Sequence, residues 1–375
     1  MPPLNLLIKP ASGNCNLRCK YCFYRSITLN RSVESYGLMS ISLLEELVKK
    51  SLEYADGYCT FGFQGGEPTL VGLDFYRKLV EYESNYNTKK VQIYNALQTN
   101  GMVIDEEWAK FLAENRFLVG ISLDGPKDIH DINRVGINNS GSFSQVMHAI
   151  GLFNKYNVEY NILTVVNSVT SRHISKIYNF FMKQGFKHLQ FIPCLDPLNE
   201  EPGRHEYSLT PKRYAYFLKT LFSLWYEDIK NGRFVSIRHF DNLVGMIMGY
   251  QPENCGMSGV CTCYFVIEAD GSTFPCDFYV IDDWKLGNIK NTSFYDMKNS
   301  ERGTRFVEAS KTVAPDCMKC PYFKLCRGGC RRNREPFRNE LPGLNYYCKS
   351  YREFFEYAGE KLKELAAIIS HHNLF

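Results

Sequence analysis

The sequence reads Cys15-Asn16-Leu17-Arg18-Cys19-Lys20-Tyr21-Cys22 directly after a short apolar run, Leu4 to Lys9. This stretch predicts an iron–sulfur cluster site on one tight loop, because three thiolates can each hold a different iron of a cubane cluster. The fourth iron would then lack a protein ligand and could bind a substrate or a cofactor. Zinc is the alternative, but a structural zinc site needs four ligands, and no fourth is near.

Strand-like and helix-like segments alternate from this stretch to about residue 192. The apolar spacing predicts helices over 40–55, with Ser40 as N-cap, and over 73–82, 105–115, 143–156 and 173–184. It predicts strands over 4–9, 58–63, 91–97, 117–123, 160–166 and 188–192. Six strands that alternate with helices, about 30 residues apart, indicate an α/β fold with a parallel sheet, whose ligands bind at the carboxyl ends of the strands.

Composition narrows the class of protein. With 375 residues, 45% hydrophobic and 22% charged, the chain is globular and suggests two or three domains, which excludes disorder and collagen. The net charge of +4 without a basic stripe predicts no nucleic-acid partner. We expect no membrane span, since no apolar run reaches about 18 residues, and no secretory signal at Met1–Asn5. A cytoplasmic location follows, where clustered cysteines more often bind metal than form disulfides.

Nine of the 14 cysteines lie between Cys255 and Cys348, where the alternation has stopped. We therefore expect two domains, 1–235 and 236–375, the second held together by bound metal. Eight of these cysteines are enough for two further cubane clusters, and two zinc sites are the alternative. The eight are Cys255, Cys261, Cys276, Cys317, Cys320, Cys326, Cys330 and Cys348. We expect the remaining Cys59, Cys194 and Cys263 to be small buried hydrophobic side chains.

The Cys-x3-Cys-x2-Cys motif after the first strand, with Tyr21 and Phe23 interleaved, resembles the radical S-adenosylmethionine (SAM) enzymes. Gly65-Gly66-Glu67-Pro68 after the second strand matches that family's GGE motif, which receives the SAM amino group. The resemblance implies a partial (β/α)6 TIM-like barrel whose first cluster is held by Cys15, Cys19 and Cys22. It implies SAM contacts from Tyr21, Gln64, Gly65, Gly66, Glu67, Ser122, Arg134 (to the SAM carboxylate) and Leu195 (to the adenine).

The C-terminal cysteine pattern is similar to the SPASM extension of radical SAM enzymes that act on peptides and proteins. That resemblance implies two auxiliary 4Fe–4S clusters, hence three clusters in all, with interleaved ligands. Cys255, Cys261, Cys276 and Cys330 would hold the first auxiliary cluster. Cys317, Cys320, Cys326 and Cys348 would hold the second. Spacing alone would group Cys317 to Cys330 together, so the place of Cys330 rests on the resemblance.

Several stretches resemble the anaerobic sulfatase-maturating enzymes within this family. They are Pro2-Pro3-Leu4, Cys15 through Tyr24, Phe63 through Leu70, Leu97 through Gly101, Ser122 through Pro126, Pro275 through Tyr279 and Leu344 through Cys348. The resemblance implies oxidation of an active-site Cys or Ser of a sulfatase to Cα-formylglycine. The implied partners are a sulfatase with a Cys/Ser-x-Pro/Ala-x-Arg motif and a flavodoxin or ferredoxin as electron donor. The sequence does not show whether Cys or Ser is preferred.

Asp277 is the candidate base for this reaction. After loss of Hβ, the substrate must lose one proton and one electron to form C=S or C=O, and a carboxylate can take the proton. Asp277 directly follows the cluster ligand Cys276. A simple turn-capping role is the alternative.

Two other functions remain open at this point. One is a radical SAM enzyme that crosslinks a small ribosomal peptide, which often has an N-terminal peptide-binding domain, whereas only three residues precede Leu4 here. The other is a non-catalytic electron carrier, which would need neither an open cluster nor the Gly-Gly-Glu-Pro loop.

Overall fold

The computed structural model describes residues 2–198, 200–335 and 343–372. Contacts divide these residues into two compact units. The first contains residues up to 123 together with 130–161 and 263–306, and the second contains 124–129, 162–262 and those from 307 onward. Both units take residues from either side of position 235, so the predicted domain boundary stays a prediction.

The first unit is built on a mostly parallel sheet, with the strand order β10-β9-β8-β1-β2-β3-β4. Strands β1 to β4 and β8 run parallel, whereas β9 and β10 are antiparallel to their neighbours. Its strands are β1 (Leu4–Lys9), β2 (Tyr58–Phe63), β3 (Gln92–Thr99), β4 (Leu118–Ser122), β8 (Val266–Glu268), β9 (Ser272–Phe274) and β10 (Gly287–Asn288).

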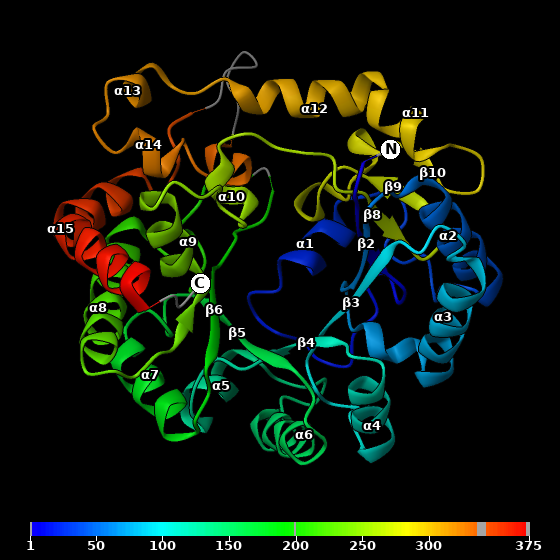
Figure 1. Cartoon of the computed structure of the whole chain (residues 1–375), viewed down its shortest axis with the longest axis horizontal. Helices are drawn as coiled ribbons and strands as arrows, with labels where there is room; N and C mark the ends of the chain where they lie inside the picture. The colour runs from blue at the N-terminus through cyan, green and yellow to red at the C-terminus, as the bar shows by residue number, and fades with distance from the viewer. Residues whose placement is uncertain (1, 199, 336–342, 373–375) are drawn as a thin grey trace. The chain divides into compact units, whose positions relative to one another are not determined.

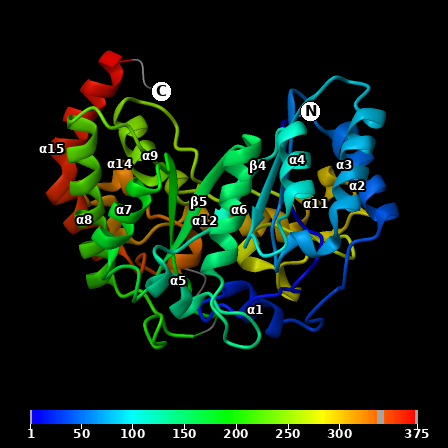
Figure 2. The same ribbon diagram turned by 90° about the horizontal axis from the view of Figure 1, so that it is seen from below.

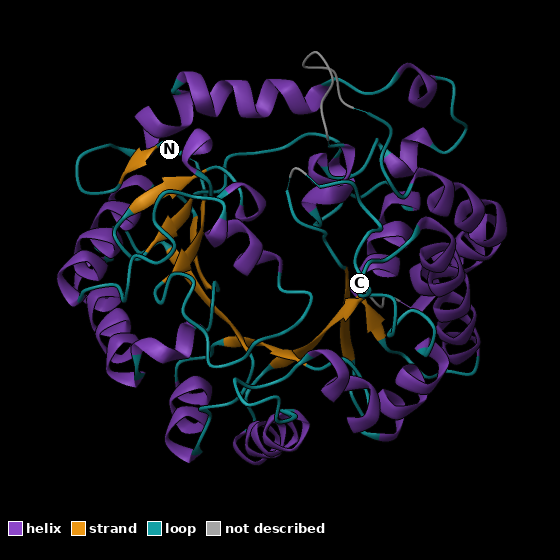
Figure 3. Ribbon diagram, turned by 180° about the vertical axis from the view of Figure 1, so that it is seen from behind, coloured by secondary structure: helices purple, strands orange, loops and turns teal. Residues whose placement is uncertain are grey.

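Helices cover one face of β1 to β4 in this unit (Figures 1 and 3). The helices of the first unit are α1 (Phe23–Leu29), α2 (Ile41–Tyr54), α3 (Leu73–Tyr86), α4 (Glu106–Glu114), α6 (Phe143–Tyr156) and α11 (Phe294–Asn299). Its 3-10 turns are η1 (Pro68–Val71), η2 (Asp277–Tyr279) and η3 (Asp282–Trp284). Elements α5 (Lys127–Asn133), β5 (Tyr160–Val166) and α12 (Glu301–Lys311) have residues in both units.

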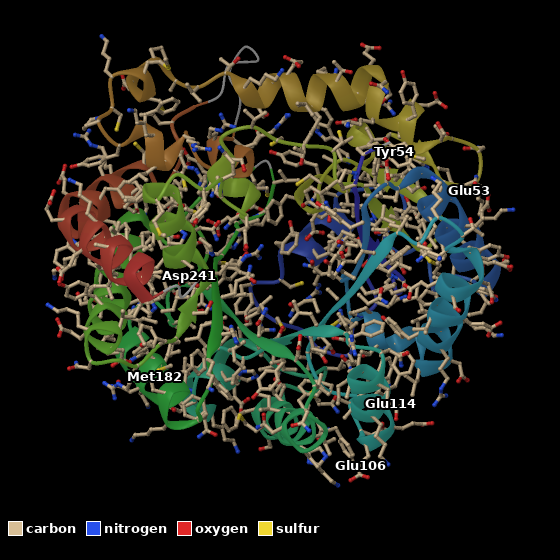
Figure 4. All side chains as sticks on the ribbon, viewed as in Figure 1. Glu53, Tyr54, Glu106, Glu114, Met182 and Asp241 are labelled. Atoms are coloured by element: carbon tan, nitrogen blue, oxygen red, sulfur yellow. The ribbon has the colours of Figure 1, made fainter. Side chains whose placement is uncertain are left out.

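Local signals explain where these helices begin. Ser40 accepts a hydrogen bond from the backbone N–H of Leu43, and Asp105 accepts one from Trp108, so each caps its helix. Glu106, which is labelled in Figure 4, points to the outer surface. It forms an ion pair with Lys155 of α6 at 2.5 Å. Helix starts are therefore readable from the sequence, as predicted for Ser40.

An aromatic cluster packs the helices against the sheet. The buried Tyr76 ring lies 5.1 Å from the ring of Phe63 and 5.3 Å from that of Trp108, measured between centroids. Aromatic pairs of this kind stabilise a core beyond the area they bury. The Tyr76 hydroxyl also donates to the carbonyl oxygen of Pro68 at 3.1 Å, so the core positions the Gly-Gly-Glu-Pro loop.

The second unit has parallel strands in the order β5-β6-β7. A second aromatic core joins α8, α9 and α15, where the Phe222 ring lies 5.3 Å from Phe240 and 5.5 Å from Phe354. Figure 2 shows α15 beside α8.

The other elements of the second unit follow in chain order. They are α7 (Ile174–Lys183), β6 (His188–Pro193), α8 (Pro211–Lys230), β7 (Ser236–Ile237), α9 (Arg238–Ile247), α10 (Cys255–Ser258), α13 (Pro315–Met318), α14 (Phe323–Cys326), η4 (Arg331–Arg334) and α15 (Cys348–His372).

Every predicted strand and helix up to residue 192 is present, with ends that differ by a few residues. The short helix α1 and the long helix α8 were not predicted. Within the described ranges, no helix combines the length and the apolar composition that crossing a membrane requires.

Glu83 of α3 is a buried carboxyl group, with 6% of the residue exposed. Its Oε2 accepts a hydrogen bond from the Asn95 side chain at 3.0 Å. Burial raises the pKa of Glu83 to about 7, and that hydrogen bond only partly opposes the shift. The side chain therefore titrates near neutral pH in the folded chain.

Glu83→Gln should stabilise the protein at alkaline pH. Because its folded-state pKa lies above the ordinary value of 4.5, the stability that Glu83 contributes at low pH is lost as the pH rises through about 7. We expect the variant to raise Tm by about 2 °C or more at pH 8 and much less at pH 5. Thermal unfolding followed by circular dichroism measures this, with the exposed Glu81→Gln of the same helix as control. Equal Tm differences at the two pH values would contradict the assignment.

Candidate active site

The cysteine loop lies between β1 and α1 in the first unit. The backbone N–H of Arg18 donates to the carbonyl oxygen of Val135 at 2.7 Å, and that of Lys20 donates to Asn133 at 3.0 Å. Segment 133–135 therefore holds the loop in place. Cys22 is the N-cap residue of α1, so the helix begins where the motif ends.

Cys15, Cys19 and Cys22 line a cavity of about 430 Å³. Burial raises the pKa of Cys15 to about 12, and the Leu17 backbone N–H opposes the shift. Iron binding would therefore displace a proton from this thiol. Across the described ranges, no three Cys, His, Asp or Glu side chains converge on a single ion. A cubane does not need such convergence, since each thiolate binds a different iron, so the donors and the cavity fit a cluster.

The Gly65-Gly66 turn packs backbone against backbone on the cysteine loop. The Gly66 N–H donates to the Ser12 carbonyl oxygen and the Glu67 N–H to that of Asn14, both at 2.8 Å. A Cβ on Gly66 would lie 2.0 Å from the Asn14 carbonyl oxygen, so only glycine fits. Gly65 has a φ of +133°, which also favours glycine.

Glu67 is a buried structural carboxylate in this loop. It accepts hydrogen bonds from the backbone and the hydroxyl of Thr69, from the Thr99 hydroxyl and from the Asn100 backbone N–H. Burial raises its pKa, and these hydrogen bonds oppose the shift. The Glu67 side chain thus ties the loop to the end of β3.

The other predicted SAM contacts occupy defined positions. Ser122 ends β4, and its hydroxyl accepts a hydrogen bond from the Gln98 side chain at 3.1 Å. The buried Arg134 guanidinium lies 5.5 Å from the centroid of the Tyr21 ring, so the structure brings these two residues together. Leu195 follows β6 in the second unit and is half-buried.

Asp277 begins the turn η2 and is 5% exposed. Its Oδ1 forms an ion pair with Lys9 Nζ at 2.5 Å, and its Oδ2 accepts a hydrogen bond from Gln64 Nε2 at 3.3 Å. Gln64, predicted as a SAM contact, therefore lies against the candidate base.

A chain of buried charges continues from Lys9. Its Nζ lies 3.8 Å from the centroid of the Tyr24 ring, and the Tyr24 hydroxyl donates to Glu268 Oε1. The same carboxylate forms an ion pair with Arg31 at 2.7 Å. No role in the site was predicted from the sequence for Lys9, Tyr24, Glu268 or Arg31. The sequence does contain one indication of this cluster, because Lys9 and Glu268 are charged residues within short strands that are otherwise largely apolar. A charged side chain in a buried strand requires a counter-charge nearby.

In the second unit, four cysteines surround a cavity of about 90 Å³. They are Cys317, Cys320, Cys326 and Cys348. Burial raises the pKa of Cys326 to about 11; the Gly328 backbone N–H opposes the shift and the three neighbouring thiolates add to it. Four thiols around one cavity form a donor set that fits a cubane cluster.

Three cysteines of the other predicted auxiliary set also lie in the second unit. A Cβ on Gly256, next to Cys255, would lie 3.6 Å from the Cβ of Cys330. Burial raises the pKa of Cys330 to about 12, a backbone N–H opposes the shift, and the charges of Cys255 and Cys261 add to it. Cys276 belongs to the first unit.

Two of the three remaining cysteines are buried, as predicted. Cys59 and Cys194 are fully or almost fully covered. The prediction for Cys263 is wrong, because this residue is half-buried and its Sγ donates to the Gly303 carbonyl oxygen at 3.7 Å.

Comparisons with known proteins match both regions of the chain. The radical SAM superfamily model matches residues 10–181, and a model described as an iron–sulfur cluster-binding domain (SPASM) matches residues 255–321. The chain is 55% identical to a cysteine-type anaerobic sulfatase-maturating enzyme of Clostridium perfringens (strain 13), over 98% of this chain and 99% of that protein. It is 33% identical to a serine-type enzyme of Bacteroides thetaiotaomicron, over 95% of this chain and 89% of that protein.

A solved structure agrees with these relatives. Native anSMEcpe with bound AdoMet and Cp18Cys peptide superimposes with a TM-score of 0.95 and 53% identity, covering 98% of this chain and 100% of that one. Because such identity extends over almost the whole chain, this protein belongs to the anaerobic sulfatase-maturating enzymes, which are radical SAM enzymes with a SPASM domain.

Proposed function

We propose that this chain oxidises an active-site cysteine of a sulfatase to Cα-formylglycine. The observation that carries the proposal is the buried Asp277 carboxylate, ion-paired and placed directly after Cys276. The cysteine type is favoured because identity is 55% to a cysteine-type relative and 33% to a serine-type one. The relatives of 50% identity or more that cover almost the whole chain are sulfatase-maturating enzymes, which favours this function over peptide crosslinking and over electron transfer alone.

The radical SAM and SPASM domains imply SAM and three 4Fe–4S clusters as cofactors. Cys15, Cys19 and Cys22 would hold the SAM-binding cluster. The two auxiliary sets would be Cys255, Cys261, Cys276 and Cys330, and Cys317, Cys320, Cys326 and Cys348. When bound, these groups supply the electron transfers and the 5′-deoxyadenosyl radical that removes the substrate's Hβ.

The geometry of the loop supports the proposed SAM contacts. Because the Glu67 side chain is engaged inside the chain, the backbone of Gly65 and Gly66 would receive the SAM amino group. Arg134, buried against Tyr21, would pair with the SAM carboxylate. Ser122 would contact the ribose or the carboxylate, and Leu195 would pack on the adenine.

Asp277 would take the substrate's proton. After Hβ is lost, Asp277 would remove the thiol proton and an auxiliary cluster, when bound, would accept one electron, which gives a thioaldehyde. Water would then convert the thioaldehyde to the aldehyde with release of H₂S. Lys9 and Gln64 hold the two carboxylate oxygens in place.

The partners and location follow from the same reaction. The substrate would be a sulfatase polypeptide with a Cys-x-Pro/Ala-x-Arg-type motif, and a flavodoxin or ferredoxin would supply electrons. A reducing cytoplasm suits the many free thiols, which support this location.

Replacing Cys15, Cys19 and Cys22 together by Ala tests the first cluster. The wild type should contain roughly 12 irons per chain, and the variant about four fewer. SAM cleavage should stop, because the open iron is lost, while the auxiliary clusters remain. Iron analysis and 5′-deoxyadenosine measurement check this. Two or three irons per wild-type chain without cluster absorption would indicate zinc-type sites instead.

Asp277→Asn tests the base. The variant keeps the size of the side chain but loses the carboxylate, so SAM cleavage should continue while aldehyde formation falls by about 100-fold or more. Mass spectrometry of both products in one anaerobic assay measures this. The exposed Asp283→Asn, a few residues away, is the control and should behave as wild type. A near-normal yield of aldehyde per deoxyadenosine in Asp277→Asn would exclude Asp277 as the base.

The substrate preference can be measured with two matched peptides. A thiol, with a pKa of about 8.5, gives up its proton to a carboxylate far more readily than an alcohol does. We therefore expect the Cys peptide to be converted faster than the Ser peptide. Products about 18 Da and about 2 Da lighter, respectively, report the two conversions. A faster reaction of the Ser peptide would contradict the cysteine type.

A further inference from the structure

Arg334, the last residue of η4, is a buried cation in the second unit. It is 2% exposed, and its guanidinium donates to the carbonyl oxygens of Ser310 and Thr312, both at 3.0 Å. Its Nε has no hydrogen-bond partner. Among the described residues, Arg334 forms no ion pair, whereas its neighbour Arg331 has Glu335 at 3.8 Å. A buried charge without a counter-charge is costly, so Arg334 requires a negative partner.

One side of Arg334 adjoins cysteines of the first auxiliary set. Ser310, which accepts the Arg334 hydrogen bond through its carbonyl, accepts another from the Cys261 backbone N–H through its hydroxyl at 2.8 Å. Cys330 directly precedes η4 as its N-cap residue. Hydrogen bonds to Ser310 therefore connect Arg334 with Cys261, and Arg334 lies on the same short segment as Cys330.

The other side adjoins the second auxiliary set. Gly328 lines the cavity formed by Cys317, Cys320, Cys326 and Cys348. A Cβ on Gly328 would lie 3.8 Å from Arg334 Nη1. The guanidinium therefore adjoins residues that contact both groups of thiols.

We propose that Arg334 is the shared counter-charge of the two auxiliary clusters and raises their reduction potentials. The inference rests on the proposed ligand sets. Thiolates that hold a cluster are the negative partner that the guanidinium otherwise lacks. Reduction of either cluster adds one electron's charge near Arg334, and the cation stabilises the reduced form more than the oxidised form. Arg334 is a positioning residue, since it acts through the clusters and touches no substrate.

The test measures midpoint potentials in a chain that lacks Cys15, Cys19 and Cys22, so that only auxiliary clusters are observed. Anaerobic redox titrations followed by electron paramagnetic resonance compare Arg334→Gln with Arg334→Lys. We expect Arg334→Gln to lower the equilibrium constant for reduction by about tenfold, which is about 59 mV for one electron. Arg334→Lys should restore most of the potential. The control Arg332→Gln, whose native side chain binds the Asp196 carbonyl oxygen, should not shift it.

A second pair of variants keeps Arg334 in place. Val313 is half-buried, and its Cγ1 lies 3.1 Å from the same Cβ position on Gly328. Val313→Glu would neutralise Arg334, whereas Val313→Gln would not, so we expect a lower potential only in the first.

The outcomes separate the two proposals. Unchanged potentials in iron-replete Arg334→Gln would overturn the role of Arg334. Equal potentials in the two Val313 variants would overturn it even if Arg334→Gln does not fold. Absence of auxiliary-cluster iron from the parent chain would instead contradict the proposed ligands.

Discussion

A lysine ammonium buried at the end of the first strand needs a negative partner, and Asp277 supplies it. Breaking such a pair leaves an unpaired buried charge, at a cost of about 3–5 kcal/mol. Tyr24, Glu268 and Arg31 extend the contact, so β1, α1, β8 and η2 are held together by alternating charges and hydrogen bonds. The geometry that holds the fold also fixes the carboxylate that the proposed chemistry requires.

Much of the fold and the site was predictable because the deciding signals are local. The spacing of apolar residues identifies a strand such as 58–63 or a helix such as 41–54 within a few residues, and Ser40 marks a helix start. The cysteine loop and the Gly-Gly turn are short motifs with narrow steric requirements, as the close approach of Gly66 to Asn14 shows. Topology then places their loops at the same end of parallel strands.

The remainder depends on contacts between residues far apart in the sequence. Lys9 reads as the end of an apolar strand, and nothing near it in the sequence reveals that its partner is Asp277. The Glu67 side chain is a similar case, because a motif match cannot show that four donors of the chain itself occupy it. Cys263 was misjudged because only the surrounding packing decides whether a thiol is covered.

The parallel pairing of β1 with β8 also has a consequence for how the protein is made. Strand β1 leaves the ribosome early, but its partner on one side, Val266–Glu268, is translated much later. Until then, β1 has an unpaired edge and Lys9 lacks its carboxylate, and exposed apolar edges of this kind promote aggregation. The sheet of the first unit can be completed only after residues 266–268, which follow Cys255 and Cys261 in the chain, have been synthesised. A nascent chain that ends before β8 therefore lacks both the partner strand of β1 and the counter-charge of Lys9.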